Sequence, residues 1–186
     1  MDPKMEPRHT IAIWVDNTPG VLSRVTGLFS GRGFNIESLC VAETMDPEVS
    51  RITIVSTGDE QITEQIIKQL HKLINTIKVV DLSELEHVER EMVLVRVKAE
   101  DKSRAEVLRI ADIFRCRVVD VSASTYTLEI TGNHDKIRAV LDLLKNHGIQ
   151  EVARTGTLAI QRSKKDYKKL QLSAFSSQLL EVRCER

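Results

Sequence analysis

The segment Asp16–Val25 has the composition best suited to bind a small molecule. Its first half, Asp-Asn-Thr-Pro-Gly, is typical of a tight turn. An apolar, β-branched run at 11–15 precedes this turn, and apolar residues at helical spacing follow it from Val21. We therefore expect a strand, a turn and then a helix, whose first backbone N–H groups lack acceptors within the helix.

Such a helix start suits a carboxylate group. The amides near Gly20, Val21 and Leu22 lie at the positive end of the helix dipole, and glycine lets a ligand approach the backbone closely. Asp16 and Asn17, just before them, offer oxygens that could accept hydrogen bonds from an ammonium group. Together these groups predict an α-amino acid site. The alternative interpretation is an ordinary capped helix after a turn.

Composition narrows the class of protein. The 186 residues suffice for one large or two small domains, and the 27 basic and 27 acidic residues balance. This balance predicts no nucleic-acid or membrane partner. No apolar run could span a bilayer, and the polar, proline-containing segment 1–10 does not resemble a signal peptide. The three cysteines, at 40, 116 and 184, lie far apart and do not have the spacing of a metal site. Their odd number and wide spacing suit a reducing compartment, so a cytoplasmic location is expected.

The first half of the chain alternates strand and helix patterns. After the opening strand and helix, the periodicity predicts strands at 34–42 and 49–56, a helix at 61–75 and a strand at 77–82. The order β-α-β-β-α-β is the ferredoxin-like pattern. Right-handed crossovers then place both helices on one face of a four-stranded antiparallel sheet.

The second half repeats this order without repeating the residues. Ser103 and Glu106 form a capping box that predicts a helix start. The predicted elements are a strand at 92–97, a helix at 103–114, strands at 118–121 and 125–130, a helix at 135–146, and strands at 149–153 and 157–160. The predicted fold class is α+β, with two ferredoxin-like βαββαβ modules, each an antiparallel sheet with helices on one face.

These patterns predict four segments. Residues 1–8 are expected to be a flexible N-terminus, 9–84 the first module, 85–162 the second, and 163–186 a polar, partly disordered tail. The acidic stretch 83–91 is interpreted as a solvated linker, with a metal or acid–base cluster as the alternative. Lysines near the start of the tail could contact nucleic acid, but no supporting basic patch accompanies them.

Residues suited to catalysis are not grouped in any known motif. The five histidines are scattered, and the chain has no nucleophile elbow, phosphate-binding loop or zinc-protease motif. Gly27, Gly31 and Gly33 lie inside and after a predicted helix, whereas a dinucleotide loop needs its glycines before one. We therefore predict no catalytic residues and no metal site, and we favour a binding protein over an enzyme.

One long run of residues is specific enough to suggest a family. Asn17–Val25 and Arg32–Leu39, with His9–Ile11 and Gly27–Phe29, resemble the regulatory (small) subunit of acetohydroxyacid synthase, also called acetolactate synthase. The resemblance covers residues 9–162 and leaves the tail after Ser163 outside it. Further matching segments are Ser50–Thr53, Gln69–Leu73, Val88–Glu91, Ile113–Arg115 and Glu151–Gly156.

The resemblance implies a regulatory role. The first module would be an ACT domain that pairs side by side with that of a second copy, so that the two sheets merge in a homodimer. Valine, or another branched-chain amino acid, would bind at this interface and inhibit a large catalytic subunit. The second module would contact and activate that subunit. The alternative is a stand-alone, amino-acid-responsive ACT-domain regulator, which would need a DNA-binding helix pair or a basic face that the sequence does not show.

The resemblance also assigns cofactors and site residues. Thiamine diphosphate, magnesium and FAD would belong to the catalytic partner, which makes precursors of valine, leucine and isoleucine, and none to this chain. Effector contacts would come from a loop asparagine and helix start in one protomer and from a strand start in the other. The first protomer would supply Asn17, Gly20, Val21 and Leu22, and the other would supply Asn35 and Ile36.

Overall fold

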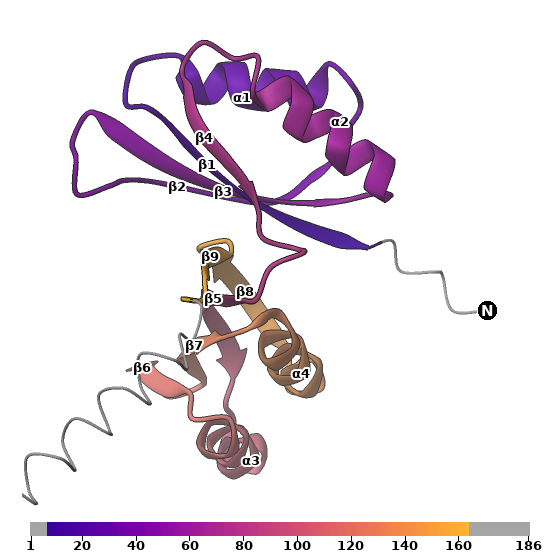
Figure 1. Ribbon diagram of the computed structural model, residues 1–186. Coiled ribbons are helices and arrows are strands. Elements are labelled where there is room, and N and C mark those ends of the chain that lie inside the picture. Colours follow the sequence, from indigo (N-terminus) through magenta and orange to yellow (C-terminus); the bar gives the residue numbers. More distant parts are fainter. Residues whose placement is uncertain (1–6, 164–186) are drawn as a thin grey trace, which may run out of the picture.

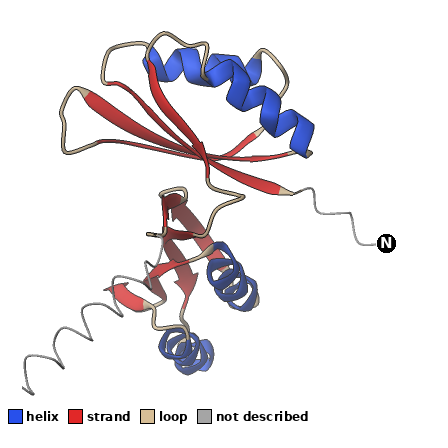
Figure 2. Ribbon diagram, in the orientation of Figure 1, coloured by secondary structure: helices blue, strands red, loops and turns tan. Residues whose placement is uncertain are grey.

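The computed structural model describes residues 7–163, which form two modules that each place two helices on one face of an antiparallel sheet (Figures 1 and 2). The strands of the first module are in the order β2-β3-β1-β4. Its elements are β1 (Arg8–Asp16), α1 (Val21–Ser30), β2 (Ile36–Glu43), β3 (Val49–Thr57), α2 (Glu60–Leu70) and β4 (Thr76–Asp81).

Side chains of β1 point alternately to the two faces of the first sheet, and each face is covered by a different part of the chain. Ile11, Ile13 and Val15 are buried under the two helices and pack with Val25 and Phe29 of α1. The residues between them point to the other face of the sheet, because side chains alternate along a strand. Ala12 is buried there against the second module, so both faces of this sheet are in part covered.

The second module has the same topology. Its strand order, β6-β7-β5-β8, is the order of the first module with each strand replaced by its counterpart. The predicted fold class, with two βαββαβ modules, is therefore confirmed. The elements are β5 (His87–Lys98), α3 (Asp101–Ile113), β6 (Arg117–Val121), β7 (Thr125–Gly132), α4 (His134–Lys145) and β8 (Ile149–Arg154), followed by β9 (Leu158–Gln161).

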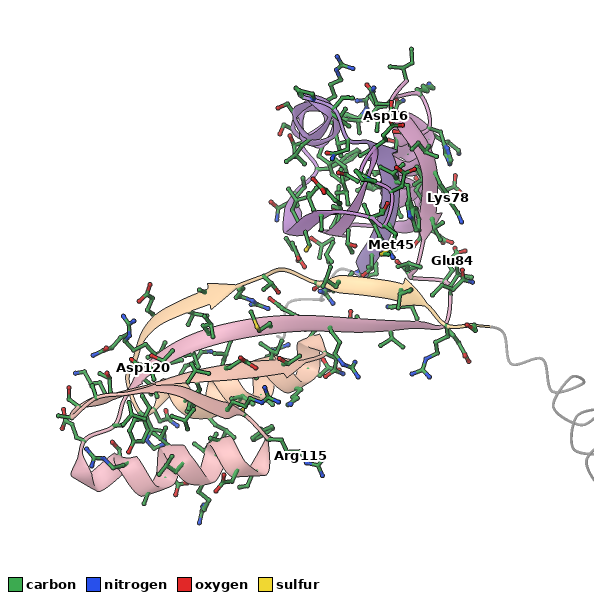
Figure 3. All side chains as sticks on the ribbon, turned by 90° about the vertical axis from the view of Figure 1, so that its left-hand side faces the viewer. Asp16, Met45, Lys78, Glu84, Arg115 and Asp120 are labelled. Carbon is green, nitrogen blue, oxygen red and sulfur yellow. The ribbon has the colours of Figure 1, made fainter. Side chains whose placement is uncertain are left out.

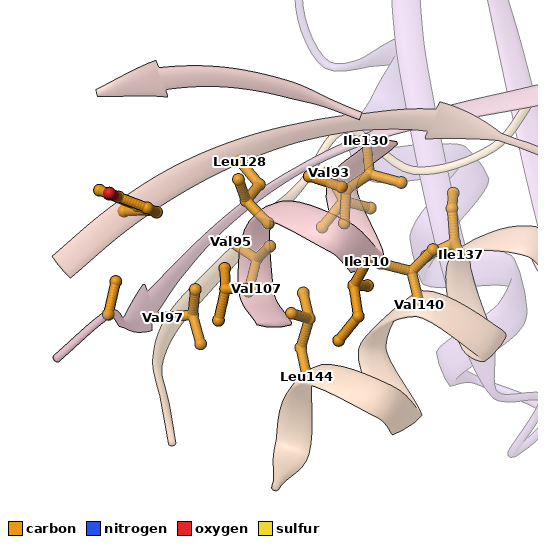
Figure 4. Packing of buried hydrophobic residues seen from close by; sticks show 13 residues of the cluster. Val93, Val95, Val97, Val107, Ile110, Leu128, Ile130, Ile137, Val140 and Leu144 are labelled. Carbon is orange, nitrogen blue, oxygen red and sulfur yellow. The ribbon is translucent and has the colours of Figure 1, made fainter. Parts of the chain in front are cut away.

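The core of the second module is built in the same way. Val93, Val95 and Val97 alternate along β5 and point toward the helices, where Val107 of α3 and Leu144 of α4 meet them (Figure 4). All five side chains are fully buried. Burial of a valine or leucine side chain contributes about 1.5–3 kcal/mol, so this layer holds sheet and helices together.

The additional strand β9 is what joins the modules. β8 pairs with the C-terminal half of β5, and β9 pairs with its N-terminal half, from His87↔Gln161 to Arg90↔Leu158. The resulting two-stranded ribbon extends from the second module to below the first (Figure 3). Ala159 of β9 lies there in a cluster with Ala12 and Leu82 of the first module.

Three sequence predictions need correction. The helix predicted to reach Asn75 ends at Leu70; Leu73 still packs on the core from the following turn and so imitates helical spacing. The stretch 83–91 is not a solvated linker throughout, because β5 begins at His87 and Glu91 is buried. Glu89 and Glu91 form ion pairs with arginines distant in the sequence, Arg8 and Arg154.

The capping box was also a wrong prediction. Helix α3 begins at Asp101 after Glu100, which makes no side-chain capping bond. Ser103 lies within the first turn, and its hydroxyl donates to the Glu100 carbonyl instead. The expectations for residues 1–6 and for the tail from residue 164 fall outside the described residues.

Candidate functional site

The turn before α1 presents an open helix start. Gly20 has φ +83°, a left-handed conformation that favours glycine, and a Cβ built on it would meet no atom within 4 Å. Gly20, the N-cap residue, has no side chain to cap this helix, and the first turn of α1 carries no acidic residue. The positive end of the α1 dipole is therefore not neutralised by a carboxylate of its own first turn.

The other two predicted residues of the helix start differ in exposure. The Val21 side chain is buried in the first core, so this residue offers an exogenous ligand only its backbone. Its N–H already makes a long contact of 3.4 Å with the Thr18 carbonyl. Leu22 is 42% exposed and presents an apolar side chain beside the turn.

Asn17 ties the turn to the hairpin between β2 and β3. Its Nδ2 donates to the Pro47 carbonyl at 2.9 Å and lies 3.4 Å from Glu43 Oε1, while its Oδ1 accepts from Ser50 Oγ at 3.0 Å. The backbone N–H of Asn17 donates to the Glu48 carbonyl at 2.7 Å. These bonds fix the loop, and any ammonium group at Oδ1 would share that oxygen with Ser50.

Sequence reasoning missed a second chain of polar contacts at this turn. Asp16 Oδ2 accepts from Asn75 Nδ2 at 3.0 Å, and Asn75 Oδ1 accepts in turn from Arg24 of α1. The backbone N–H of Asp16 also donates to the Asn75 carbonyl. Asn75 follows α2, 59 residues from Asp16 along the chain. No local pattern could have indicated this contact, because it depends on how β4 enters the sheet.

Asn35 and Ile36 lie at the opposite end of the sheet. Ile36 pairs with Ser56 of β3, whereas Glu43, at the other end of β2, pairs with Ser50 near Asn17. Seven residues of strand separate the two ends, which corresponds to roughly 20 Å. One chain therefore brings Asn17, Gly20, Val21 and Leu22 together, but not Asn35 and Ile36.

Within residues 7–163, no group of histidine, cysteine, aspartate or glutamate side chains could hold a metal ion. No helix in the same range is long and apolar enough to cross a membrane.

The sequence is similar to curated proteins along most of their length. It is 52% identical over 158 residues to the probable acetolactate synthase small subunit of Archaeoglobus fulgidus, covering 85% of this chain and 99% of that protein. It is 49% identical over 160 residues to the acetolactate synthase small subunit of Haemophilus influenzae, covering 86% and 98%. The chain belongs to the acetolactate synthase small-subunit family.

Family models and a solved structure agree with this assignment. Residues 11–78 match the ACT domain of acetohydroxyacid synthase small-subunit-like proteins, and residues 90–163 match the model for the small subunit of acetolactate synthase. The fold resembles the crystal structure of the Thermotoga maritima small subunit, with a TM-score of 0.78 and 39% identity over 85% of this chain and 99% of that one. Membership of this family supports a role as a regulatory subunit that acts with a large catalytic partner.

Proposed function

We propose that this protein is the regulatory subunit of a thiamine-diphosphate-dependent acetolactate synthase. It stimulates the large catalytic subunit and transmits feedback inhibition by valine or another branched-chain amino acid. The amino acid binds where the ACT domains of two copies meet. Thiamine diphosphate, magnesium and FAD belong to the catalytic subunit in this proposal, and the present chain needs no cofactor.

The observation that carries this proposal is that the two half-sites lie near opposite ends of one edge strand, β2. β2 is the edge of the first sheet. If two copies pair through β2 in antiparallel fashion, the start of β2 in one copy lies beside the end of β2 in the other. Asn35 then reaches the neighbourhood of the other copy's Asn17 and Gly20, although these groups are separated within one chain.

The open helix start fits the carboxylate of the amino acid. Its N–H groups near Gly20 and Leu22 donate to the carboxylate oxygens, and among residues 7–163 only the chain neighbours of Gly20 come within 4 Å of where a Cβ at Gly20 would be. Hydrogen bonds to a charged group contribute about 1.5–3 kcal/mol each. Leu22 offers the apolar contact that a branched side chain needs, and Asn35 of the other copy supplies a polar side chain for the ammonium group.

Inhibition follows if the ligand prefers one arrangement of the two ACT domains. A ligand shifts the population toward the arrangement that it binds better, and linkage makes the effect reciprocal between effector and catalytic subunit. The alternative, a stand-alone amino-acid-responsive regulator, predicts no such partner. Capture of a large thiamine-diphosphate enzyme from lysate by the tagged chain supports the subunit role, and stable purification without one contradicts it.

The first test introduces a negatively charged side chain where the carboxylate of valine is proposed to bind. Gly20→Asp should weaken valine binding about tenfold or more, because the new side-chain carboxylate would repel the carboxylate of the bound valine. The matched control is Gly148→Asp, since Gly148 has a similar φ of +80° but lies in the second module. Isothermal titration calorimetry measures both variants. Wild-type affinity in the Gly20→Asp variant would refute the site.

The second test concerns the half-site from the other copy. Asn35→Ala should raise the valine concentration needed for half-inhibition of the reconstituted enzyme about ten- to a hundredfold, the loss expected for one hydrogen bond to a charged group. Asn146→Ala, at the exposed end of α4, is the control and should leave inhibition unchanged. Unaltered inhibition in both variants would remove Asn35 from the site.

A further inference from the structure

The second module attaches directly to the edge strand of the ACT domain. The Thr157 N–H donates to the Ser38 hydroxyl of β2 at 2.8 Å, and Thr157 is only 3% exposed. Its own hydroxyl accepts from Arg8 Nη2 at 3.0 Å. A buried N–H needs an acceptor, so Ser38 fixes the position of this loop on β2.

The neighbouring Gly156 brings the two backbones into close contact. A Cβ at this position would lie 2.9 Å from Ser38 Oγ and 3.2 Å from the Leu39 carbonyl oxygen. Gly156 also has φ +82°, so both the conformation and the lack of space favour glycine. The loop that separates β8 from β9 therefore lies against β2, with no side chain of its own at the closest point.

Charged side chains extend this junction from the edge strand to helix α4. Arg8 lies 3.7 Å from Glu37 of β2 and 3.4 Å from Glu89 of β5. Glu89 accepts a hydrogen bond from the N–H of His134, the first residue of α4. A hollow of about 490 Å³ adjoins these residues and gives their side chains room to rearrange.

The junction and the proposed effector residues share one short segment. Asn35 and Ile36, assigned to the effector, directly precede Ser38, which bonds to the second module, and Glu37, which is linked to it through Arg8. The pairing of β2 with β3 shifts register between Ile36 and Ser38, so this part of the strand is irregular. Bulges of this kind re-aim side chains beside functional sites.

We propose that Ser38, Gly156 and Thr157 couple effector binding to the position of the second module. This inference depends on the proposed valine site and adds the route by which its occupancy reaches the rest of the chain. Binding at Asn35 moves the start of β2 between two arrangements, and the loop at Gly156 follows because Ser38 holds it. The second module then presents a different surface to the catalytic subunit, which is the differential contact that allostery requires.

Two variants loosen this junction without altering the effector residues. Ser38→Ala removes the acceptor of the Thr157 N–H, and Gly156→Ala pushes the loop away from β2. In the reconstituted holoenzyme, each should raise the half-inhibitory concentration of valine about tenfold, a usual size for allosteric coupling. Valine affinity, measured by calorimetry on the same full-length chains, should stay within about twofold of wild type if coupling alone is lost.

Gly148→Ala is the matched control. It imposes the same left-handed strain, at φ +80°, but its nearest neighbour is the flexible Lys98 side chain in its own module. The control should keep both valine affinity and inhibition. Inhibition that stays normal in Ser38→Ala and Gly156→Ala, or that falls only in proportion to affinity, would refute the coupling. Absence of valine binding in the wild-type chain would instead refute the proposed function, and the coupling with it.

Discussion

Two glycines with nearly equal backbone angles serve different purposes. Gly20 and Gly156 have φ of +83° and +82°. Around Gly20 there is open space, whereas Gly156 lies against the β2 backbone. Alanine in a left-handed conformation costs roughly 1–2 kcal/mol at either position, but only at Gly156 does a steric clash add to this cost. Open space suits ligand access, and its absence suits a fixed contact between modules.

Two glutamate–arginine pairs within the second module offer a comparison of burial. The Glu91 side chain is 4% exposed and accepts two hydrogen bonds from Arg154, at 2.6 and 2.8 Å. This bidentate contact raises the pKa of the Arg154 guanidinium, although burial opposes the shift. Glu151, which pairs with Arg96, is 65% exposed. Solvent screens the second pair far more strongly than the first.

We predict that Glu91→Gln lowers the free energy of unfolding by about 2 kcal/mol, because Arg154 loses a charged, bidentate acceptor in a buried position. Arg154 itself is half-exposed, which keeps the loss below that of a fully buried pair. Glu151→Gln should cost less than about 1 kcal/mol. Urea unfolding followed by circular dichroism measures both, and equal losses would contradict the assigned difference in burial.

At the scale of elements, periodicity indicated most strands and helices correctly. Helix α1 was predictable because Val21, Val25 and Leu28 face the core at helical spacing. The end of α2 and the start of β5 were not, because both depend on residues far away in sequence. Leu73 packs on the core from a turn, and Glu91 is a buried strand residue whose charge is paired with Arg154, 63 residues later in the chain.

The candidate site was likewise predictable in part. The turn chemistry of Asp16–Gly20 indicated an open helix start, which the structure has. The bonds of Asn17 to the β2–β3 hairpin and of Asp16 to Asn75 required the folded sheet. The resemblance implied that Asn35 and Gly20 act from different protomers, and the strand register shows that the two residues lie near opposite ends of β2 within one chain.

Edge strand β2 allows a direct test of the proposed homodimer. If antiparallel pairing places Ile36 beside Thr44 of the other copy, just after its β2, the two-fold axis passes through residue 40 and the two Cys40 residues lie opposite each other. A chain with Cys116→Ala and Cys184→Ser, which retains Cys40 alone, should form a disulfide-linked dimer on mild oxidation. Disulfides form only where the two Cα atoms are about 4.4–6.8 Å apart.

Gel electrophoresis without reducing agent measures this cross-link. Further substitution of Cys40→Ser in the same background should abolish it. Addition of valine should alter the rate of cross-linking, because the ligand is proposed to bridge the same interface. A chain that remains monomeric after oxidation, with Cys40 accessible to a maleimide, would contradict pairing through β2.

At the scale of the whole molecule, a small apolar cluster joins the modules in addition to the contacts of the Gly156 loop. Ala159 of β9 is 5% exposed and packs with Ala12 and Leu82, while Trp14 and Val80 border the cluster. Arg51 lies over the Trp14 ring and donates to the Ala159 carbonyl. Burial lowers the pKa of Arg51, as expected for a cation removed from water. Coupling between modules should therefore depend on this contact as well as on the Gly156 loop.

We predict that Ala159→Asp separates the modules without unfolding either. A carboxylate in this apolar cluster costs several kcal/mol unless it reaches water, and it reaches water if the first sheet moves away from β9. Leu158→Asp, one residue earlier on the same strand and 53% exposed, is the control. Small-angle X-ray scattering should show a larger radius of gyration for Ala159→Asp alone, and its thermal unfolding should change from one transition to two.

Because valine would still bind the ACT dimer but could no longer reposition the second module, this variant should retain affinity and lose inhibition. An unchanged radius together with intact inhibition would show that the cluster does not hold the modules together.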